Sequence, residues 1–324
     1  MSHGCHDLHF LTIWHSLCKL VHRSISAQSA LHRAQLIPAS LRVESHDMKT
    51  TIRFWGVRGS VASPGPETVQ VGGNTSCVEI VTDHHRIVLD AGTGLRGLGN
   101  HLMKEGRSDI TLLLSHLHWD HIQGLPFFAP LYQPETRIDV FSGAFNAPLR
   151  ETLRRQMSAP TFPVDLNEVP ARLGFQELRD QQRIVLKDVE VTICRANHPD
   201  AVFAYRIQHG DCSVVYATDT EHYPCVDPRL VALARNADVL IYDAQYLPEE
   251  YAGQTGMSRV GWGHSTYEAA VELARAAGVG KLMLFHHDPS RSDDQVREIE
   301  ARAQERFPDA FAACEGMTLA LGEV

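Results

Sequence analysis

The most constraining feature of the sequence is a group of three histidines and one aspartate directly behind an apolar run. The run ends at Leu114 and is followed at once by Ser-His-Leu-His-Trp-Asp-His. A strand-to-loop turn can aim His116 and His118, two positions apart, into one pocket. Asp120 and His121 open a predicted helix and enter that pocket from another angle. Imidazoles and carboxylates are the ligands that borderline divalent metals prefer, so the segment predicts a metal site with room for two ions, in preference to a histidine-rich surface loop.

Further along the chain, other polar residues also close apolar, strand-like runs. His198, Asp219 and His286 each follow such a run, and Asp90 does so upstream. Taken singly, His198 or Asp219 would more often be an ordinary loop residue. The ordered set of strand-end positions instead suggests that these residues belong to the same site.

This combination resembles the metallo-β-lactamase superfamily, whose signature His-x-His-x-Asp-His after a strand is filled here at every position. Residues 89–94, Leu-Asp-Ala-Gly-Thr-Gly, look like the family's first motif, in which a buried aspartate, here Asp90, supports the metal-binding loop from behind the ligands. The resemblance implies an α/β (α+β) fold, the αββα sandwich, as a single domain. It also implies two divalent metal ions, with Zn²⁺ expected and Mn²⁺ or Fe²⁺ as alternatives.

By the same resemblance, the two ions share a defined set of ligands. His116, His118 and His198 would hold one ion, Asp120, His121 and His286 the other, and Asp219 would bridge them. His287 is the alternative to its neighbour His286, with which the family's last motif aligns. Two cations about 3.5–4 Å apart turn a shared water into hydroxide near neutral pH and stabilise the charge of an in-line displacement. Asp120 is also expected to orient that hydroxide.

A second motif, Gly-His-Ser-Thr at 263–266, precedes an Ala-rich helical pattern. It resembles the phosphodiesterase branch of the superfamily, which includes the tRNA 3′-processing endonuclease Z group. In that branch the histidine protonates the leaving group, a role that falls here to His264. Imidazole suits it because its ordinary pKa lies close to the working pH. Alternatively, Ser265 or Thr266 caps the helix and His264 is a loop residue.

A third segment narrows the resemblance to bacterial cyclic-phosphate and cyclic-nucleotide phosphodiesterase-like hydrolases. It runs from Arg-Phe-Trp-Gly-Val-Arg-Gly-Ser at 53–60 to Gly-Gly-Asn-Thr-Ser-Cys at 72–77. Asn74 and Ser76 could offer hydrogen-bond donors to a substrate, and Arg58 could meet a phosphate or a surface carboxylate. The alternative is a hairpin-like entrance with a core strand behind it.

A proline-stiffened segment, residues 157–165, carries Phe162 between a predicted helix and the next strand. Such a loop could cover a ligand and bring Phe162 against the substrate. An ordinary surface connection explains the same residues equally well.

Charge and cysteine usage limit the partners and the compartment. The formal net charge of −9 argues against a surface built to hold nucleic acid, because that binding depends on Lys and Arg at phosphates. The seven cysteines form no Cys-x-x-Cys pair and are odd in number, so we expect a reducing, cytoplasmic environment. No apolar run reaches the length of a membrane span, and no secretory signal is indicated.

Residues 1–47 differ from the rest of the chain. They hold His3, His6 and His9 but none of the motifs above, and Met48 stands directly before the family-like region. We predict a poorly ordered extension or a mis-assigned start at 1–47 and a hydrolase domain at 48–324. An amphipathic helix around Trp14, for a membrane surface or a partner, is the alternative.

The periodicity of residues 48–324 predicts a mixture of strands and helices. Strands are expected at 51–55, 77–82, 86–90, 110–115, 137–141, 189–196, 201–208, 212–218, 238–242, 281–285 and 317–321, and helices near 94–105, 120–132, 146–158, 227–236, 265–278 and 292–306. Periodicity alone fixes no sheet topology.

These features predict a dinuclear metal-dependent phosphodiesterase that hydrolyses a small cyclic nucleotide or other cyclic phosphate by metal-bound hydroxide, with His264 as general acid. The first alternative is a tRNA 3′-end endonuclease. Those enzymes commonly carry a long arm between the ligands that match His198 and Asp219, where this chain has only the twenty residues 199–218. The second alternative is a non-catalytic metal-binding regulatory module. A homodimer is expected by resemblance.

Overall fold

The computed structural model describes residues 49–106, 109–143 and 148–322. The predicted extension 1–47, with the helix proposed around Trp14, lies outside these residues. None of the described helices is long and apolar enough to cross a membrane.

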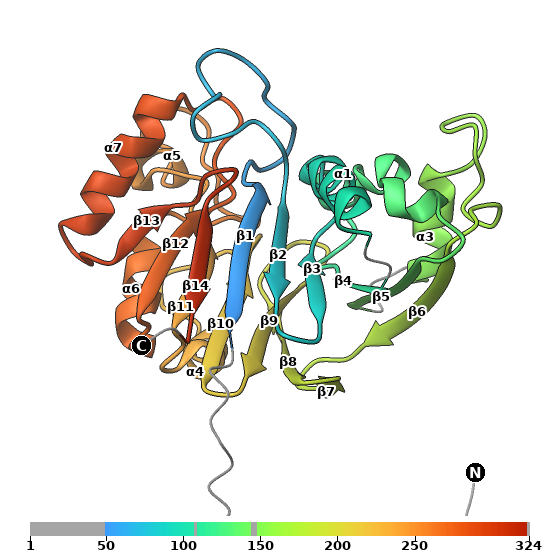
Figure 1. The fold of residues 1–324 in the computed structure, drawn as a ribbon. Coiled ribbons are helices and arrows are strands. Elements are labelled where there is room, and N and C mark those ends of the chain that lie inside the picture. Colours follow the sequence, from blue (N-terminus) through green and yellow to red (C-terminus); the bar gives the residue numbers. More distant parts are fainter. Residues whose placement is uncertain (1–48, 107–108, 144–147, 323–324) are drawn as a thin grey trace, which may run out of the picture. The chain divides into compact units, whose positions relative to one another are not determined.

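Two seven-stranded sheets form the centre of the fold (Figure 1). In spatial order, the first contains β14 (Thr318–Leu321), β1 (Thr50–Gly56), β2 (Cys77–Val81), β3 (Arg86–Leu89), β4 (Asp109–Leu113), β5 (Arg137–Gly143) and β6 (Arg172–Leu178). The second contains β13 (Ala310–Ala312), β12 (Lys281–Phe285), β11 (Val239–Asp243), β10 (Cys212–Ala217), β9 (Val202–His209), β8 (Val189–Ala196) and β7 (Arg183–Leu186). Apart from β14, each sheet is built from one continuous part of the chain.

Alternating side chains hold the two sheets face to face. Ile87 and Leu89 of β3 join Ile241 of β11 in the core between the sheets. Val88 points the other way, into the layer under the helices of the first sheet, and Leu240 does the same in the second sheet. This period of two is the expected consequence of the strand pleat when both faces of a sheet are covered.

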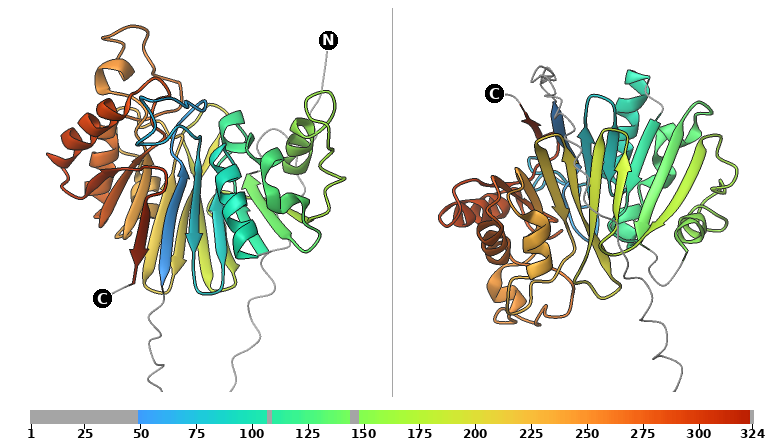
Figure 2. Two further views of the ribbon diagram at one scale, coloured as in Figure 1. Left: turned by 45° about the horizontal axis from the view of Figure 1, so that its top comes forward. Right: turned by 90° about the horizontal axis from the view of Figure 1, so that it is seen from below.

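Helices cover the outer face of each sheet (Figure 2). The first sheet packs against α1 (Gly94–Glu105), α2 (Trp119–Ile122), the 3₁₀ turns η1 (Leu125–Phe127) and η2 (Ala129–Tyr132), and α3 (Leu149–Gln156). The second packs against α4 (Pro228–Ala234), α6 (Tyr267–Ala277) and α7 (Asp293–Gln304), and the short α5 (Pro248–Tyr251) precedes α6 in the chain. The predicted αββα sandwich is confirmed.

One sequence expectation about the elements was wrong, and three strands were missed. The helix predicted at 120–132 is divided into α2, η1 and η2, because Pro126 and Pro130 lack the N–H groups that a continuous helix needs. Three strands, β6, β7 and β13, had no prediction. All three lie at the ends of their sheets, and β7 alternates only between half-buried and exposed positions. Edge strands bury less apolar surface, which weakens the pattern that identifies a strand.

Strand direction brings the polar strand-end residues together. β3, β4 and β5 are mutually parallel, and so are β10, β11 and β12. β8 runs in the same direction as β10, because both are antiparallel to β9. The loops that follow these strands therefore leave each sheet at one edge, where α/β proteins commonly place their ligands.

Candidate metal centre

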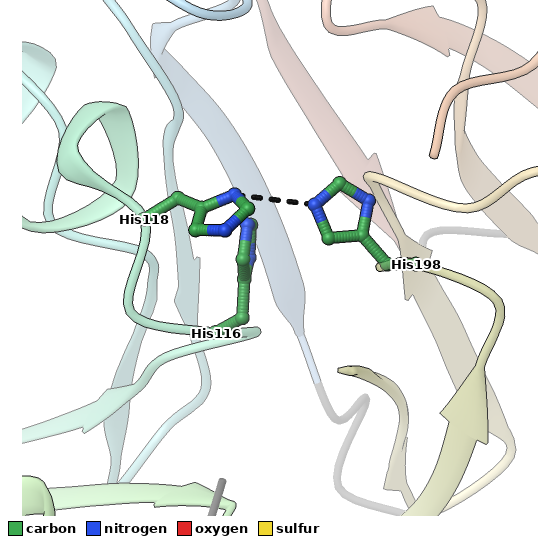
Figure 3. Close-up of side chains that lie close together, drawn as sticks. All are labelled: His116, His118 and His198. Atoms are coloured by element: carbon green, nitrogen blue, oxygen red, sulfur yellow. Dashed lines mark hydrogen bonds between the residues drawn. The ribbon is translucent and has the colours of Figure 1, made fainter. Parts of the chain in front are cut away.

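Three histidines from the two sheets face one another at this edge (Figure 3). His116 and His118 follow β4, and His198 follows β8. Nδ1 of His118 lies 3.1 Å from Nε2 of His198. The ring centroid of His116 lies 4.4 Å from that of His118 and 4.9 Å from that of His198.

The outer nitrogen of each ring has its own hydrogen-bond acceptor. His118 Nε2 donates to Asp200 (3.0 Å) and His198 Nδ1 donates to the Gly263 carbonyl (3.0 Å). His116 Nδ1 lies 3.1 Å from the Ser115 hydroxyl. With these tautomers, inferred from the hydrogen-bond network, the inward nitrogens carry bare lone pairs. The short approach of His118 to His198 then joins two acceptors, an arrangement that a shared cation stabilises.

A second cluster adjoins the first and contains both histidines and carboxylates. Its members are Asp120, His121, Asp219 and His286, all buried. Nε2 of His121 lies 3.3 Å from Asp120 Oδ2 and 3.2 Å from Asp219 Oδ1, and Nε2 of His286 lies at the same two distances from the same atoms. Ligands bound tetrahedrally to zinc at its usual bond lengths stand about 3.3 Å apart. The cluster therefore has the spacing of a metal site.

The tautomers in the second cluster also direct lone pairs inward. His121 Nδ1 donates to Asp90 (2.8 Å), and His286 Nδ1 donates to the amide oxygen of Gln245 (2.8 Å). Inside the protein, the Nε2 atoms of His116 and His121 are buried without a hydrogen-bond partner among the described residues. Buried polar atoms are rarely left so, and a bound cation accounts for both.

Asp219 connects the two clusters. Its Oδ1 faces His121 and His286, while its Oδ2 lies 3.7 Å from Nε2 of His116. Burial alone would raise the pKa of this carboxyl, but the imidazoles of His121 and His286 outweigh burial and hold the pKa well below its usual range. Asp219 is thus an anion placed between the ring nitrogens of the two clusters.

Asp90 fixes the loop that carries the histidines. Its carboxylate accepts hydrogen bonds from the Ser115 backbone N–H (2.7 Å), the Ser115 hydroxyl (2.8 Å) and the Tyr216 hydroxyl (2.7 Å), besides His121. Asp90 is fully buried. Groups that orient metal ligands in this way are as important to a metal site as the ligands themselves.

Three residues of the site have left-handed backbone conformations. The φ angles are +62° at Asp90, +51° at Asp219 and +61° at His286. Each residue follows a strand, and the unusual conformation turns the chain sharply at the sheet edge. Such backbone is costly for residues other than glycine and persists where surrounding contacts hold it, typically at functional sites.

His264 stands beside the second cluster, paired with a buried carboxylate. Its Nδ1 donates to Asp243 (2.8 Å), and its ring stacks on that of His286 at 5.0 Å. Asp243 also accepts from the backbone N–H groups of Ser265 and Gln245. Burial would lower the pKa of His264, but the Asp243 carboxylate outweighs it and raises that pKa to about 9. Thr266 caps α6, as the helix-cap reading of the Gly-His-Ser-Thr motif predicted.

Comparison with known proteins identifies the family of the chain. The model of the "Beta-lactamase superfamily domain" matches residues 85–287, which span both clusters and His264. A curated relative, Ribonuclease Z of Mycobacterium sp. (strain KMS), is 30% identical over 271 residues, covering 76% of this chain and 88% of its own. The chain belongs to the metallo-β-lactamase superfamily. It is accordingly a hydrolase of that superfamily, whose members typically bind two divalent metal ions.

Solved structures of the superfamily share the fold of this chain. The metallo-β-lactamase fold protein YhfI from Bacillus subtilis matches with a TM-score of 0.63 and 19% identity, over 84% of this chain and 99% of its own. A diphosphatase from the PhnP family matches with a TM-score of 0.60 and 17% identity, over 83% and 97%. At these identities the likeness concerns the fold alone.

The structure corrects two expectations about substrate binding in this metallo-β-lactamase domain. Arg58 is 0% exposed, and its guanidinium donates to the backbone carbonyls of Gly72, Asp288 and Arg291. It therefore joins two loops, and its Nη2 lies 3.8 Å from the Asp293 carboxylate, which is the carboxylate alternative but at a buried position. The side chain of Asn74 donates to Glu315 (2.9 Å), which likewise gives it a structural partner.

The remaining sequence candidates are placed as follows. Ser76 is fully buried, and its hydroxyl has no partner among the described residues. Phe162 is partly buried and packs edge-on against Phe127 at 5.7 Å, while the segment before it folds back through turns.

His287, the alternative to His286, makes no hydrogen bond with the described residues of either cluster. Its Nε2 lies 3.0 Å from the Ala313 carbonyl, and burial lowers the pKa of His287 to about 3. The structure thus brings His286 into the cluster and turns His287 away.

Sequence reasoning missed three polar residues that support the site. Asp243 orients His264, Gln245 orients His286, and Glu221 holds the loop in front of His264. Asp243 ends β11 as Asp219 follows β10, so the strand-end rule could have found it. Glu221 and Gln245 act through contacts between distant segments and leave no local signal.

Proposed function

We propose that this enzyme is a dinuclear metal-dependent phosphodiesterase that hydrolyses a small phosphodiester, such as a cyclic nucleotide or another cyclic phosphate. One observation carries the proposal. In five histidines, one ring nitrogen has an oxygen hydrogen-bond partner outside the two clusters, and the other lies among the potential ligand atoms of a cluster. This is how proteins prepare histidines to bind metal ions.

The ligand sets follow from the two clusters. His116, His118 and His198 would hold one ion, Asp120, His121 and His286 the other, and Asp219 would lie between them. Nitrogen and carboxylate ligands in this mixture suit Zn²⁺, with Mn²⁺ or Fe²⁺ as alternatives. Two bound cations supply activation of the attacking water and neutralisation of the charge on the phosphoryl oxygens.

The residues of the chain supply positioning and proton transfer. Asp243 holds Nδ1 of His264 and leaves its Nε2 available to protonate the departing oxygen. Asp120, which accepts from the Ser60 backbone N–H (2.7 Å), is positioned to orient the attacking water. Asp90 and Gln245 keep His121 and His286 in the required tautomers.

Substrate size is argued from the interval between His198 and Asp219. A continuous antiparallel hairpin, β9 and β10, fills it, with residue pairs from Cys212↔His209 to Tyr216↔Tyr205. No long arm for gripping RNA occupies this position, and the net charge is −9. Both points support a small substrate.

A tRNA 3′-end endonuclease is the second candidate function. Curated relatives named Ribonuclease Z, at 30% identity over 76% of this chain, favour it. A non-catalytic metal-binding regulatory module is the third, and the His264–Asp243 pair beside the clusters argues against it.

The deciding experiment is a hydrolysis panel with Zn- and Mn-loaded protein. The panel contains bis-p-nitrophenyl phosphate, 2′,3′- and 3′,5′-cyclic nucleotides, ribose cyclic phosphate and a precursor tRNA. Asp120→Ala should abolish turnover, and Asp211→Ala, an exposed aspartate in the β9–β10 turn, should not. Turnover of the small diesters supports the proposal. Cleavage of the tRNA alone replaces it with the endonuclease, and inactivity of fully metallated protein on every member refutes both.

The family resemblance further supports a cytoplasmic homodimer as part of this proposal. Sedimentation velocity at micromolar concentration measures the oligomeric state directly. A single species of monomer mass would contradict the dimer.

A further inference from the structure

An unusual cation and aromatic pair stands at the rim of the site, in the segment between α5 and α6. The guanidinium carbon of Arg259 lies 4.3 Å from the ring centroid of Trp262 and 5.9 Å from that of Tyr246. Trp262 is 46% exposed. Arg259 makes no ion pair with a carboxylate within the part of the chain that the structure describes. A half-exposed indole and an unpaired guanidinium thus stand together.

Ring contacts connect this pair to the proposed general acid. Tyr246 is buried and packs edge-on against His264, with centroids 5.8 Å apart. The ring of Tyr246 therefore lies between His264 and Arg259, and the half-exposed Trp262 packs against Arg259. In the left view of Figure 2, the segment after α5, in orange, loops out beyond the ends of the strands.

The backbone on both sides of Trp262 is held in place. The N–H groups of Gly261 and Gly263 donate to the two carboxylate oxygens of Glu221, at 2.7 and 3.0 Å. The Gly263 carbonyl in turn accepts from His198. The backbone at Trp262 is consequently held two residues from His264, and the indole ring packs against Arg259.

We infer that Trp262 and Arg259 form a nucleobase-binding subsite, which assigns nucleotides as the substrate class of the phosphodiesterase proposed above and rests on that proposal. Nucleobases stack on aromatic side chains and on guanidinium planes, and guanidinium N–H groups suit the oxygen and nitrogen acceptors of base edges. A phosphate alone would pair with the charge of Arg259 but would not stack on the indole of Trp262. A base uses both.

Two substrates that differ only in the base test the inference. They are adenosine 2′,3′-cyclic phosphate and ribose 2,3-cyclic phosphate. We expect kcat/KM to favour the adenosine compound about tenfold or more, as a stacking interaction allows. Trp262→Ala should abolish this preference, mainly through KM, and leave the ribose compound unchanged, whereas Trp262→Phe should retain most of it. Met257→Ala, a change at an exposed apolar residue of the same segment, is the matched control.

A second readout does not depend on turnover. Adenosine 5′-monophosphate and ribose 5-phosphate are titrated calorimetrically into metal-loaded wild type, Trp262→Ala and Arg259→Ala. Tighter binding of the adenosine compound, lost in both variants, supports the subsite even if neither cyclic phosphate is hydrolysed, which would be a failure of the proposed function alone. Equal binding of the two compounds by wild type, or an equal loss for both in the variants, overturns the subsite.

Discussion

At the residue scale, the chemistry depends most directly on the pair formed by His264 and Asp243. The Asp243 carboxylate fixes the tautomer of His264 and favours its protonated form. A proton donor is needed only when the departing oxygen is strongly basic. The role of His264 can therefore be tested by changing the leaving group.

We predict that His264→Ala lowers kcat on 2′,3′-cyclic nucleotides about 10²–10⁴-fold. The loss should be much smaller on bis-p-nitrophenyl phosphate, because p-nitrophenolate leaves without protonation. Metal content, measured by atomic emission, should stay at the wild-type value. Equal losses on both substrates, or loss of metal, would show that His264 serves as a ligand or a structural residue instead.

At the element scale, the segment between α5 and α6 is held to the sheet by one buried carboxylate. Glu221 is 1% exposed and accepts from Tyr251 Oη (2.6 Å) as well as from Gly261 and Gly263. All the donors converge on this side chain, so its loss affects His198 and His264 together.

Glu221→Gln should therefore destabilise the protein by about 1–3 kcal/mol, because an amide cannot accept all the hydrogen bonds that the carboxylate accepts. Urea unfolding measures this change. Tyr251→Phe removes only one donor and should cost about 0.5–1.5 kcal/mol. If Glu221→Gln is as stable as the wild type, Glu221 does not hold the segment.

Two glycines in the same segment form a matched pair for a second test. Gly261 and Gly263 have φ angles of +86° and +87°. A methyl group at Gly261 meets nothing within 4 Å, whereas one at Gly263 would overlap the ring of His198. Both substitutions by alanine carry the same backbone penalty, about 1–2 kcal/mol.

Only Gly263→Ala should also displace His198, so we expect it to weaken binding of one metal ion at least tenfold while Gly261→Ala leaves binding unchanged. Competition with a chromophoric chelator gives the two metal affinities. Identical affinities in the two variants would contradict the placement of His198 among the ligands.

At the scale of the whole molecule, the proposed metal ligands come from both sheets. His116, His118 and His121 leave the first sheet, and His198, Asp219 and His286 leave the second. Bound ions would therefore join the two layers of the sandwich. A ligand that binds only the folded state stabilises it in proportion to the logarithm of its concentration.

We expect chelation to lower the melting temperature and added Zn²⁺ to raise it in a concentration-dependent way. At one hundred times the dissociation constant, Zn²⁺ should add about 2.7 kcal/mol to the free energy of unfolding. Differential scanning calorimetry across a zinc series measures the effect. Because the ligands must be deprotonated, the stabilisation should fade as the pH drops below that at which free histidine titrates. A melting temperature independent of zinc would contradict a bridging site.

The family resemblance implied the αββα fold, while periodicity alone predicted only a mixture of strands and helices. The residues that the structure gathers at one edge could be named from the sequence because strand-end positions and the His-x-His-x-Asp-His spacing are local patterns. Sequence reasoning failed where the outcome depends on distant partners. Arg58 looked accessible, but loops more than two hundred residues away bury it. Glu221 carried no pattern at all, since its donors come from residues at least thirty positions further along.

The division of the sheets along the chain has one more consequence. Between β6 and β7 the polypeptide passes from one layer to the other through residues 179–182, and on either side of that turn the set of proposed metal ligands is incomplete. A chain cut there would yield two fragments, neither able to assemble the centre by itself. If mixing the two fragments restores hydrolysis, the enzyme's own turnover measures how well the fragments reassemble.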